Sequence, residues 1–140
     1  MKAAFALAIL VPLAAACQSP AGEDRSTQPF DAIAETETIS FTGTEPFWGG
    51  EAVGASLTYT TIENPDGTQI PVRRFAGNSG LSLSGMIGPD KFDMVITKGE
   101  CSDGMSDRTY PYTVTLQVGA EQRNGCAWTS AQPFTGPANP

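Results

Sequence analysis

The residues best suited to chemistry lie together in the stretch CSDGMSDRTYPY, residues 101–112. It contains two carboxylates, Asp103 and Asp107, and either of them with Glu45 would make an acid–base pair of the kind that hydrolyses glycans. The chain has no histidine, which excludes Ser-His-Asp and Cys-His catalysis in their usual forms and histidine-ligated zinc. Acidic pairs are common on a chain with 15 Asp and Glu residues, so we predict that the protein is not an enzyme.

Metal binding by the same stretch would need a suitable ligand pattern. An EF-hand loop alternates acidic ligands before a Gly and ends in Glu, and DGMSDR does not match that pattern. Thioether sulfur is a soft ligand for copper(I), but Met94 falls on an apolar strand face and Met86 ends a strand, so both are predicted to be core. Only Met105 lies in a predicted loop. We therefore predict no metal site and no cofactor.

The stretch also has the composition of a tight structural corner. Asp103-Gly104 and Ser106-Asp107 are turn formers whose side chains bond nearby backbone N–H groups, and Arg108 is a candidate partner for either aspartate. We favour this corner interpretation. A binding site is the alternative, because loops on rigid scaffolds often carry sites.

Alternation of apolar and polar residues with a period of two identifies the elements that must position these residues. The segments ASLTYTTI, LSLSGMI, KFDMVIT and YTVTLQV all show it, and it predicts strands with one buried and one solvated face. The turn signal NPDG (64–67) predicts a hairpin between strands near 55–62 and 69–76. VGAEQ predicts a turn into the last strand, which also contains Asn124-Gly125. We predict an all-β fold, an antiparallel meander of seven or eight short strands closed into a small barrel or sandwich.

The first sixteen residues have the anatomy of a secretory signal peptide. Lys2 precedes an apolar run that is too short to span a membrane, and small residues precede Cys17. LAAAC (13–17) resembles a bacterial lipobox, which implies acylation of Cys17. Ala14 stands where leucine is preferred, so ordinary cleavage that leaves a free thiol is the alternative. A glutamine rather than an aspartate after the cysteine implies an outer-membrane anchor facing the periplasm or the cell surface.

The remaining chain divides into three parts. Residues 17–38 are small, polar and acidic and predict a flexible tether behind the lipidated cysteine. The β-domain is predicted at 39–131. Three prolines in the last nine residues, 132–140, predict a loose tail.

The cysteine count favours one disulfide. The chain has three cysteines, and a leftover thiol is unfavourable in an oxidising compartment. If Cys17 carries lipid, Cys101 and Cys126 remain as a pair. Their disulfide would stabilise a domain of this size by about 3–4 kcal/mol in the chain-entropy description.

The net charge narrows the range of partners. Loss of Lys2 with the signal peptide leaves 7 of the 8 basic residues against 15 acidic ones, a formal charge of −8. Such a surface excludes nucleic acid as a natural ligand. It attracts a cationic protein or envelope component.

Three segments resemble the motifs of a known family: FTGTEPFWG (41–49), CSDGMSDRTYPY and GCA (125–127). The family consists of small, uncharacterised lipoproteins and periplasmic proteins of proteobacteria, and it is loosely similar to the domain of the heat-shock lipoprotein HslJ. The resemblance covers residues 41–127, with one departure at Gly49-Gly50, where an alternating strand is expected to begin. It implies an envelope location and this fold class, and it implies no activity.

Trp48 and the loop at 103–110 form the candidate functional face. If Trp48 points outward, it would lie in an acidic, aromatic patch suited to a cationic or sugar-like group. The competing interpretation is that Phe47 and Trp48 plug one end of the barrel. Adjacent strand residues point to opposite faces, so at most one of the two is deeply buried. The residues predicted to surround Trp48 are Glu45, Asp103, Met105, Asp107 and Tyr110.

Together these features predict an outer-membrane-anchored lipoprotein whose small β-domain acts in binding or envelope maintenance. A sharper version is an inhibitor of a cationic envelope enzyme such as lysozyme. The alternative is a weak carboxylate-based enzyme acting on cell-envelope glycans.

Overall fold

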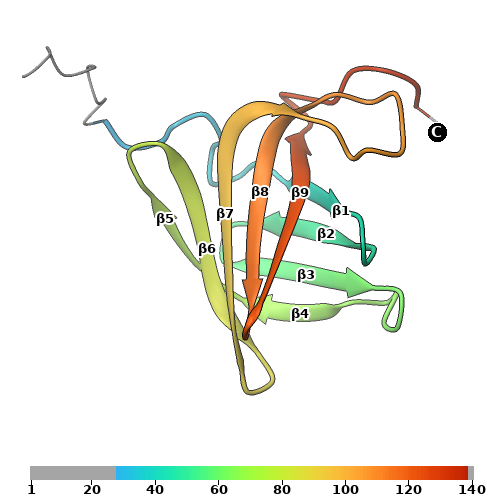
Figure 1. Ribbon diagram of the computed structural model, residues 1–140. Coiled ribbons are helices and arrows are strands. Elements are labelled where there is room, and N and C mark those ends of the chain that lie inside the picture. Colours follow the sequence, from blue (N-terminus) through green and yellow to red (C-terminus); the bar gives the residue numbers. More distant parts are fainter. Residues whose placement is uncertain (1–27, 139–140) are drawn as a thin grey trace, which may run out of the picture.

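The computed structural model describes residues 28–138, and in that range the chain forms nine strands and no helix (Figure 1). The all-β prediction is confirmed. All the pairings are antiparallel, within one sheet that curls into a nearly closed barrel. The strands are β1 (Ile39–Gly43), β2 (Trp48–Val53), β3 (Ser56–Thr61), β4 (Thr68–Pro71), β5 (Arg73–Ala76), β6 (Gly80–Ile87), β7 (Asp90–Cys101), β8 (Tyr110–Val118) and β9 (Glu121–Thr129).

The strand order, β4-β3-β2-β1-β9-β8-β7-β6-β5, is that of a meander whose first and last strands pair. The seam lies between β4 and β5, which form one extended segment bent at Val72: β4 pairs with β3, and β5 pairs with β6. The single strand predicted at 69–76 is therefore two strands, which raises the count to nine from the seven or eight predicted. Gly85 of β6 comes so close to β4 that a Cβ there would lie 2.6 Å from the Pro71 carbonyl oxygen.

The barrel core consists of the apolar residues that the period-two pattern placed on one face. Met94 is fully buried as predicted. The prediction for Met86 is wrong: its side chain is 52% exposed, because it is out of phase with the inward residues Leu81 and Leu83 of β6. Buried residues of the alternating segments are Leu57, Tyr59, Leu81, Leu83, Phe92, Met94, Ile96, Tyr112, Val114 and Leu116.

The turns follow local sequence chemistry. In the NPDG turn the Gly67 N–H donates to the Asn64 carbonyl oxygen at 3.2 Å, and Gly67 adopts a positive φ of 84°. VGAEQ connects β8 and β9, as predicted. Asn124 and Gly125 lie within β9 and form no turn.

The segments on either side of the β-domain are not loose within the described range. Ile33 is buried in the core, and the Arg74 guanidinium donates to its carbonyl oxygen at 2.6 Å. Thr109 and Thr135 exchange two backbone hydrogen bonds. The packed domain therefore extends beyond the predicted 39–131 on both sides, because Ile33 joins the core and Phe134 packs against Tyr110 and Trp128.

Two predictions depend on residues that the structure does not describe. The signal peptide and Cys17 lie outside residues 28–138, as does the first part of the predicted tether. Within the described residues there is no helix with the length and apolar character needed to span a membrane.

Candidate functional site

Three segments far apart in sequence meet at one end of the barrel. Gly43 pairs with both Trp48 and Gly125 across neighbouring strands. Cys101 and Cys126 form the predicted disulfide, and the Thr44 hydroxyl donates to the Asp103 carbonyl oxygen at 3.3 Å. We call this region, residues 41–48, 101–110 and 125–128, the loop end.

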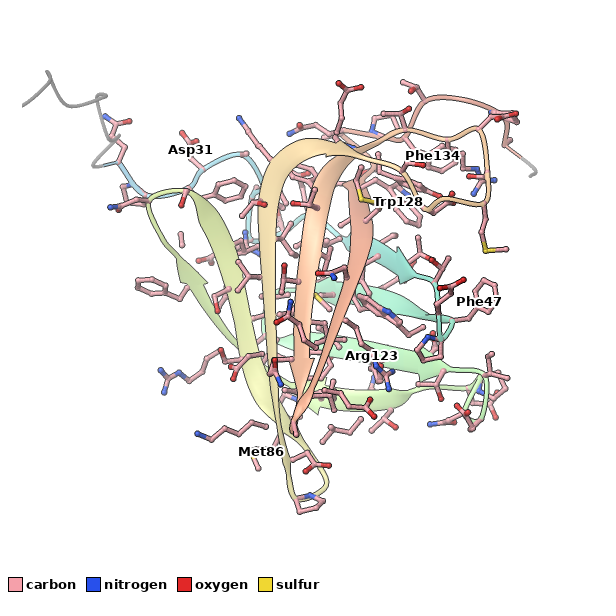
Figure 2. All side chains as sticks on the ribbon, in the orientation of Figure 1. Asp31, Phe47, Met86, Arg123, Trp128 and Phe134 are labelled. Atoms are coloured by element: carbon pink, nitrogen blue, oxygen red, sulfur yellow. A yellow bond between two sulfur atoms is a disulfide. The ribbon has the colours of Figure 1, made fainter. Side chains whose placement is uncertain are left out.

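Trp48 lies inside the barrel. It is 4% exposed, whereas Phe47 is 49% exposed and points away from the sheet (Figure 2). The prediction that at most one of the two is buried is confirmed. Trp48 therefore does not point outward, and of the two residues in the plug interpretation only Trp48 lies inside the barrel.

Two glycines make room for the Trp48 indole. A Cβ at Gly43 would overlap the indole ring, and one at Gly125 would lie 2.9 Å from Trp48 Cζ2. Phe41 and Tyr59 pack on either side, with ring centroids 6.0 and 6.2 Å from that of Trp48. The indole Nε1–H has no hydrogen-bond partner among the described residues, which costs part of the packing gain. The motif segments GTEPFW and GCA therefore both serve to pack the Trp48 indole inside the barrel.

Asp103 organises the loop between β7 and β8. Its Oδ1 accepts hydrogen bonds from the backbone N–H groups of Met105 at 3.0 Å and Ser106 at 2.8 Å. Its Oδ2 accepts from the Ser106 hydroxyl at 2.7 Å and the Tyr110 hydroxyl at 3.2 Å. One carboxylate thus gathers four donors from the loop that it helps to form, which supports the corner interpretation of this stretch.

These hydrogen bonds also keep the Asp103 carboxyl group ionised. The hydrogen bond from the Ser106 backbone is the largest influence that lowers the pKa of Asp103, from 3.8 to about 2, and the bonds from Met105, the Ser106 hydroxyl and Tyr110 add to it. A carboxylate that is ionised so strongly and already accepts four hydrogen bonds is a poor general acid or base near neutral pH. Glu45 and Asp107, the other two carboxylates predicted for acid–base chemistry, are exposed to solvent.

The region outside β9 holds a second, smaller aromatic cluster. Tyr110, Trp128 and Phe134 pack together with ring centroids 5.3 to 5.6 Å apart. The Arg108 guanidinium lies 4.4 Å above the Phe134 ring and donates to the carbonyl oxygens of Pro137 and Ala138. The predicted pairing of Arg108 with an aspartate is therefore wrong, since the C-terminal segment supplies its acceptors.

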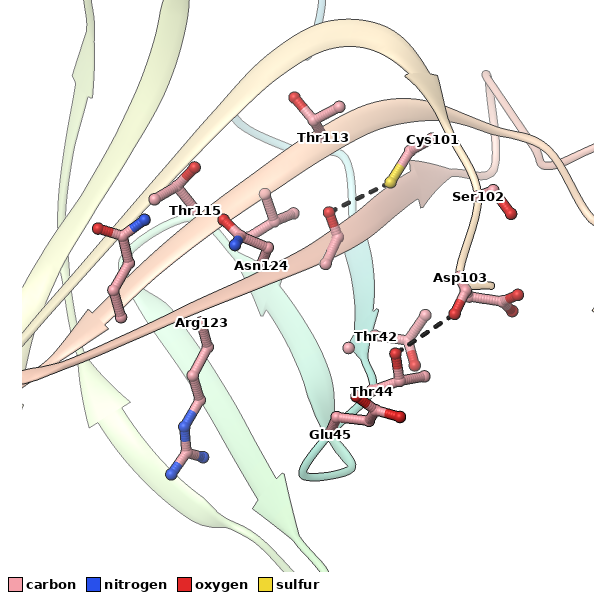
Figure 3. A pocket seen from close by; sticks show the side chains of 14 residues that line it. Thr42, Thr44, Glu45, Cys101, Ser102, Asp103, Thr113, Thr115, Arg123 and Asn124 are labelled. Atoms are coloured by element: carbon pink, nitrogen blue, oxygen red, sulfur yellow. Dashed lines mark hydrogen bonds between the residues drawn. The ribbon is translucent and has the colours of Figure 1, made fainter. Parts of the chain in front are cut away.

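The disulfide lies on the outer face of the sheet. Ala127 belongs to the barrel core, so Cys126 beside it points outward. The pairing of β7 with β8 shifts register between Lys98 and Cys101, and β7 ends at Cys101. Cys101 Sγ lies 3.3 Å from the Gly125 carbonyl oxygen (Figure 3). That is a packing contact, because a disulfide sulfur carries no proton.

Two hollows at the loop end are lined by residues of the 101–110 loop. The first, which we call the Phe47 hollow, has a volume of about 280 Å³ and is lined by Phe47, Met105, Tyr110 and Trp128 among others. The second, which we call the outer groove, has a volume of about 520 Å³ and lies on the outer face of β1, β8 and β9 (Figure 3). They share Thr42, Thr44 and Asp103.

The structure brings most of the predicted site residues to this end but rearranges their roles. Asp103, Met105 and Tyr110 contribute to the Phe47 hollow, Glu45 lines the outer groove, and Asp107 is exposed on the loop. Sequence reasoning missed Phe47 and Trp128 as lining residues. The rule that neighbours on a strand point oppositely does identify Phe47 once Trp48 is known to be buried.

No group of three or more Cys, Asp and Glu side chains within residues 28–138 is placed to hold a metal ion. No protein-family model, no curated protein and no solved structure matches the chain. The family resemblance of its three motifs therefore stays a prediction.

Proposed function

We propose that this protein is a lipoprotein anchored in the outer membrane, facing the periplasm or the cell surface, and that its β-domain binds a cationic protein without catalysing a reaction. One observation carries the proposal. Phe47 and Met105 are exposed on the same hollow, from two segments that the Thr44–Asp103 hydrogen bond joins. The partner that we propose is a cationic envelope-directed enzyme such as lysozyme, which the protein would inhibit.

The apolar residues of the Phe47 hollow have the composition of a binding surface. Phe47 is 49% exposed and Met105 67%, and Tyr110 and Trp128 lie behind them. Aromatic residues and Met are enriched at the centres of protein interfaces. The loop beneath is held by Asp103 and by the Cys101–Cys126 disulfide, so little ordering entropy remains to oppose binding.

Charge supports a cationic partner. Glu45 and Asp107 are exposed on the two segments that carry Phe47 and Met105. A neighbouring hollow, also lined by Phe47, includes Ile62 and Pro65, and the exposed Glu63 lies between these two residues in sequence. Carboxylates around an apolar centre would steer a basic protein toward this end and align it.

The alternative function is weak carboxylate-based catalysis on envelope glycans. The Asp103 carboxylate already accepts four hydrogen bonds, which supports the non-catalytic proposal. Glu45 and Asp107 would have to serve as acid and base without Asp103. Incubation of purified protein with peptidoglycan distinguishes the two. Release of soluble fragments would establish the enzyme, and slower digestion by added lysozyme is the result that we expect.

The binding proposal is tested by titrating lysozyme into the full-length protein and into single variants. Phe47→Ala and Met105→Ala should each weaken binding at least tenfold, about 1.4 kcal/mol. Phe75→Ala and Met86→Ala are matched controls, because these side chains are 69% and 52% exposed but line neither hollow; they should leave affinity unchanged. Cytochrome c, also basic, should not bind. Equal binding of both basic proteins would reduce the interaction to general charge attraction and refute the proposal.

The membrane anchor has a separate test. Mass spectrometry of the mature protein should show an acylated Cys17 at its N-terminus. A soluble mature chain that begins at an unmodified Cys17 would exclude the anchor and leave the binding proposal intact.

A further inference from the structure

The outer groove differs in chemistry from the Phe47 hollow beside it. Its floor is the outer face of β1, β8 and β9, and the end of β7 with the following residues lies along one side (Figure 3). Thr42, Thr44, Thr113, Thr115, Gln122 and Asn124 provide most of its side chains. Hydroxyl and amide groups both donate and accept hydrogen bonds and carry no charge.

Most of these groups have no partner within the protein. The Thr44 hydroxyl is used by Asp103 and that of Thr113 by Thr97. The other four, on three adjacent strands, have no hydrogen-bond partner among residues 28–138. Thr115 and Asn124 stand directly opposite each other in the β8–β9 ladder. The free groups are Thr42, Thr115, Gln122 and Asn124.

The charged side chains in the lining of the groove are mostly engaged in other contacts. Arg123 leaves β9 on the side away from Asn124 (Figure 3) and donates to the Tyr59 hydroxyl at 2.6 Å and to Glu121 at 2.7 Å. The Asp103 carboxylate is occupied by its four loop donors. Glu45 is the one remaining charged side chain in the lining, and it is exposed.

The floor of the groove is rigid. Its free groups lie on strands in the middle of the sheet order, each paired on both sides. The disulfide fixes the end of β7 to β9, and the hydroxyls of Thr97 and Thr113 lie 2.6 Å apart across β7 and β8. The paired strands fix the positions from which these side chains extend, so little backbone freedom is lost when a ligand binds.

We propose that the outer groove binds a neutral, polyhydroxylated ligand, a glycan. Its volume of about 520 Å³ is in the range of small-molecule sites, about 300–1,000 Å³. Most such sites are lined mainly by apolar residues, whereas the free side chains on this floor carry uncharged hydroxyl and amide groups, which favour a ligand that offers many hydroxyls and no charge. This site adjoins the Phe47 hollow and shares Thr42, Thr44 and Asp103 with it, but Phe47 and Met105 do not line it.

The test uses the tetramer of N-acetylglucosamine as a neutral probe and NMR titration of the full-length protein. The amides of Thr115, Gln122 and Asn124 should shift and saturate. The double variant Thr115→Val/Gln122→Met removes two free polar groups with little change of shape, and it should weaken binding about tenfold. The double variant Thr58→Val/Gln69→Met makes the same two changes on exposed or half-exposed positions of β3 and β4 and should bind as the wild type does.

The results that would overturn the proposal are specific. They are an absence of saturable shifts, equal affinity of the two double variants, or shifts centred on Phe47 and Met105. Binding only of the protonated glucosamine tetramer would likewise show attraction by Glu45 and the net charge rather than a neutral site. Because lysozyme binding is measured with variants of Phe47 and Met105, failure of either proposal leaves the other standing.

Discussion

The barrel interior and the loop end are stabilised by different kinds of contact. The interior repeats one motif, an apolar side chain at every second position of a strand, and each residue there contributes through burial. The loop end depends on a few specific contacts: the disulfide, the glycines beside Trp48 and the four hydrogen bonds to Asp103. The difference shows that a small domain can hold its loops in place without enlarging its core.

Trp48 and Phe47 give the sharpest contrast, because they are adjacent aromatic residues with opposite environments. Trp48→Ala should lower the free energy of unfolding by about 3–5 kcal/mol, since it empties a buried aromatic site. Phe47→Ala should lower it by less than about 0.5 kcal/mol, as expected for an exposed position. Chemical denaturation followed by circular dichroism measures both. Similar losses for the two variants would contradict the burial difference.

Loss of the disulfide should have the next largest effect on the free energy of unfolding. Replacement of Cys101 and Cys126 by Ser should lower the free energy of unfolding by about 3–4 kcal/mol. The far-ultraviolet β-sheet spectrum should persist in the folded variant, because the barrel core lies on the other face of the sheet. In the native protein, alkylation without reductant should leave both cysteines unlabelled, and free labelling of both would refute the disulfide.

The tight packing of Trp48 against Gly43 predicts a smaller loss of stability. Gly43→Ala should lower the free energy of unfolding by about 1–3 kcal/mol, the usual cost of overpacking. In the Trp48→Ala background the same substitution should cost much less, since the side chain it meets is gone. Additive losses in this double-mutant cycle would mean that Gly43 is needed for another reason.

The smallest expected effect concerns the loop end and depends on pH. Asp103→Asn should lower the free energy of unfolding by about 1–2 kcal/mol near neutral pH, less than the sum of four charge-assisted hydrogen bonds because the carboxylate is partly exposed. The folded pKa of Asp103 is lowered from 3.8 to about 2, so its contribution is complete above pH 3.8 and is lost as the pH falls toward 2. The difference between wild type and variant should therefore shrink in that window. A difference that stays constant from pH 5 to pH 2 would contradict the assignment.

The loop end was harder to predict than the barrel for a physical reason. Asp103 and its acceptor role follow from turn chemistry within a few residues, and the sequence indicated them. The partners of Arg108 are carbonyl oxygens about thirty residues away, and no local pattern points to them. Phe134 joins the cluster of Tyr110 and Trp128 from a segment whose prolines had predicted a loose tail.

The strand content, the inward faces of β3, β6, β7 and β8, and the turns at 64–67 and after Val118 were determined by sequence alone, since side-chain alternation and turn preferences act over a few residues. Only the tertiary structure decided that Trp48 rather than Phe47 points inward, because the choice depends on Gly43 and Gly125 leaving space across two strand pairings. It likewise decided that the segment 68–76 bends at Val72 into two strands, because closing the curled sheet requires that segment to leave β3 and join β6.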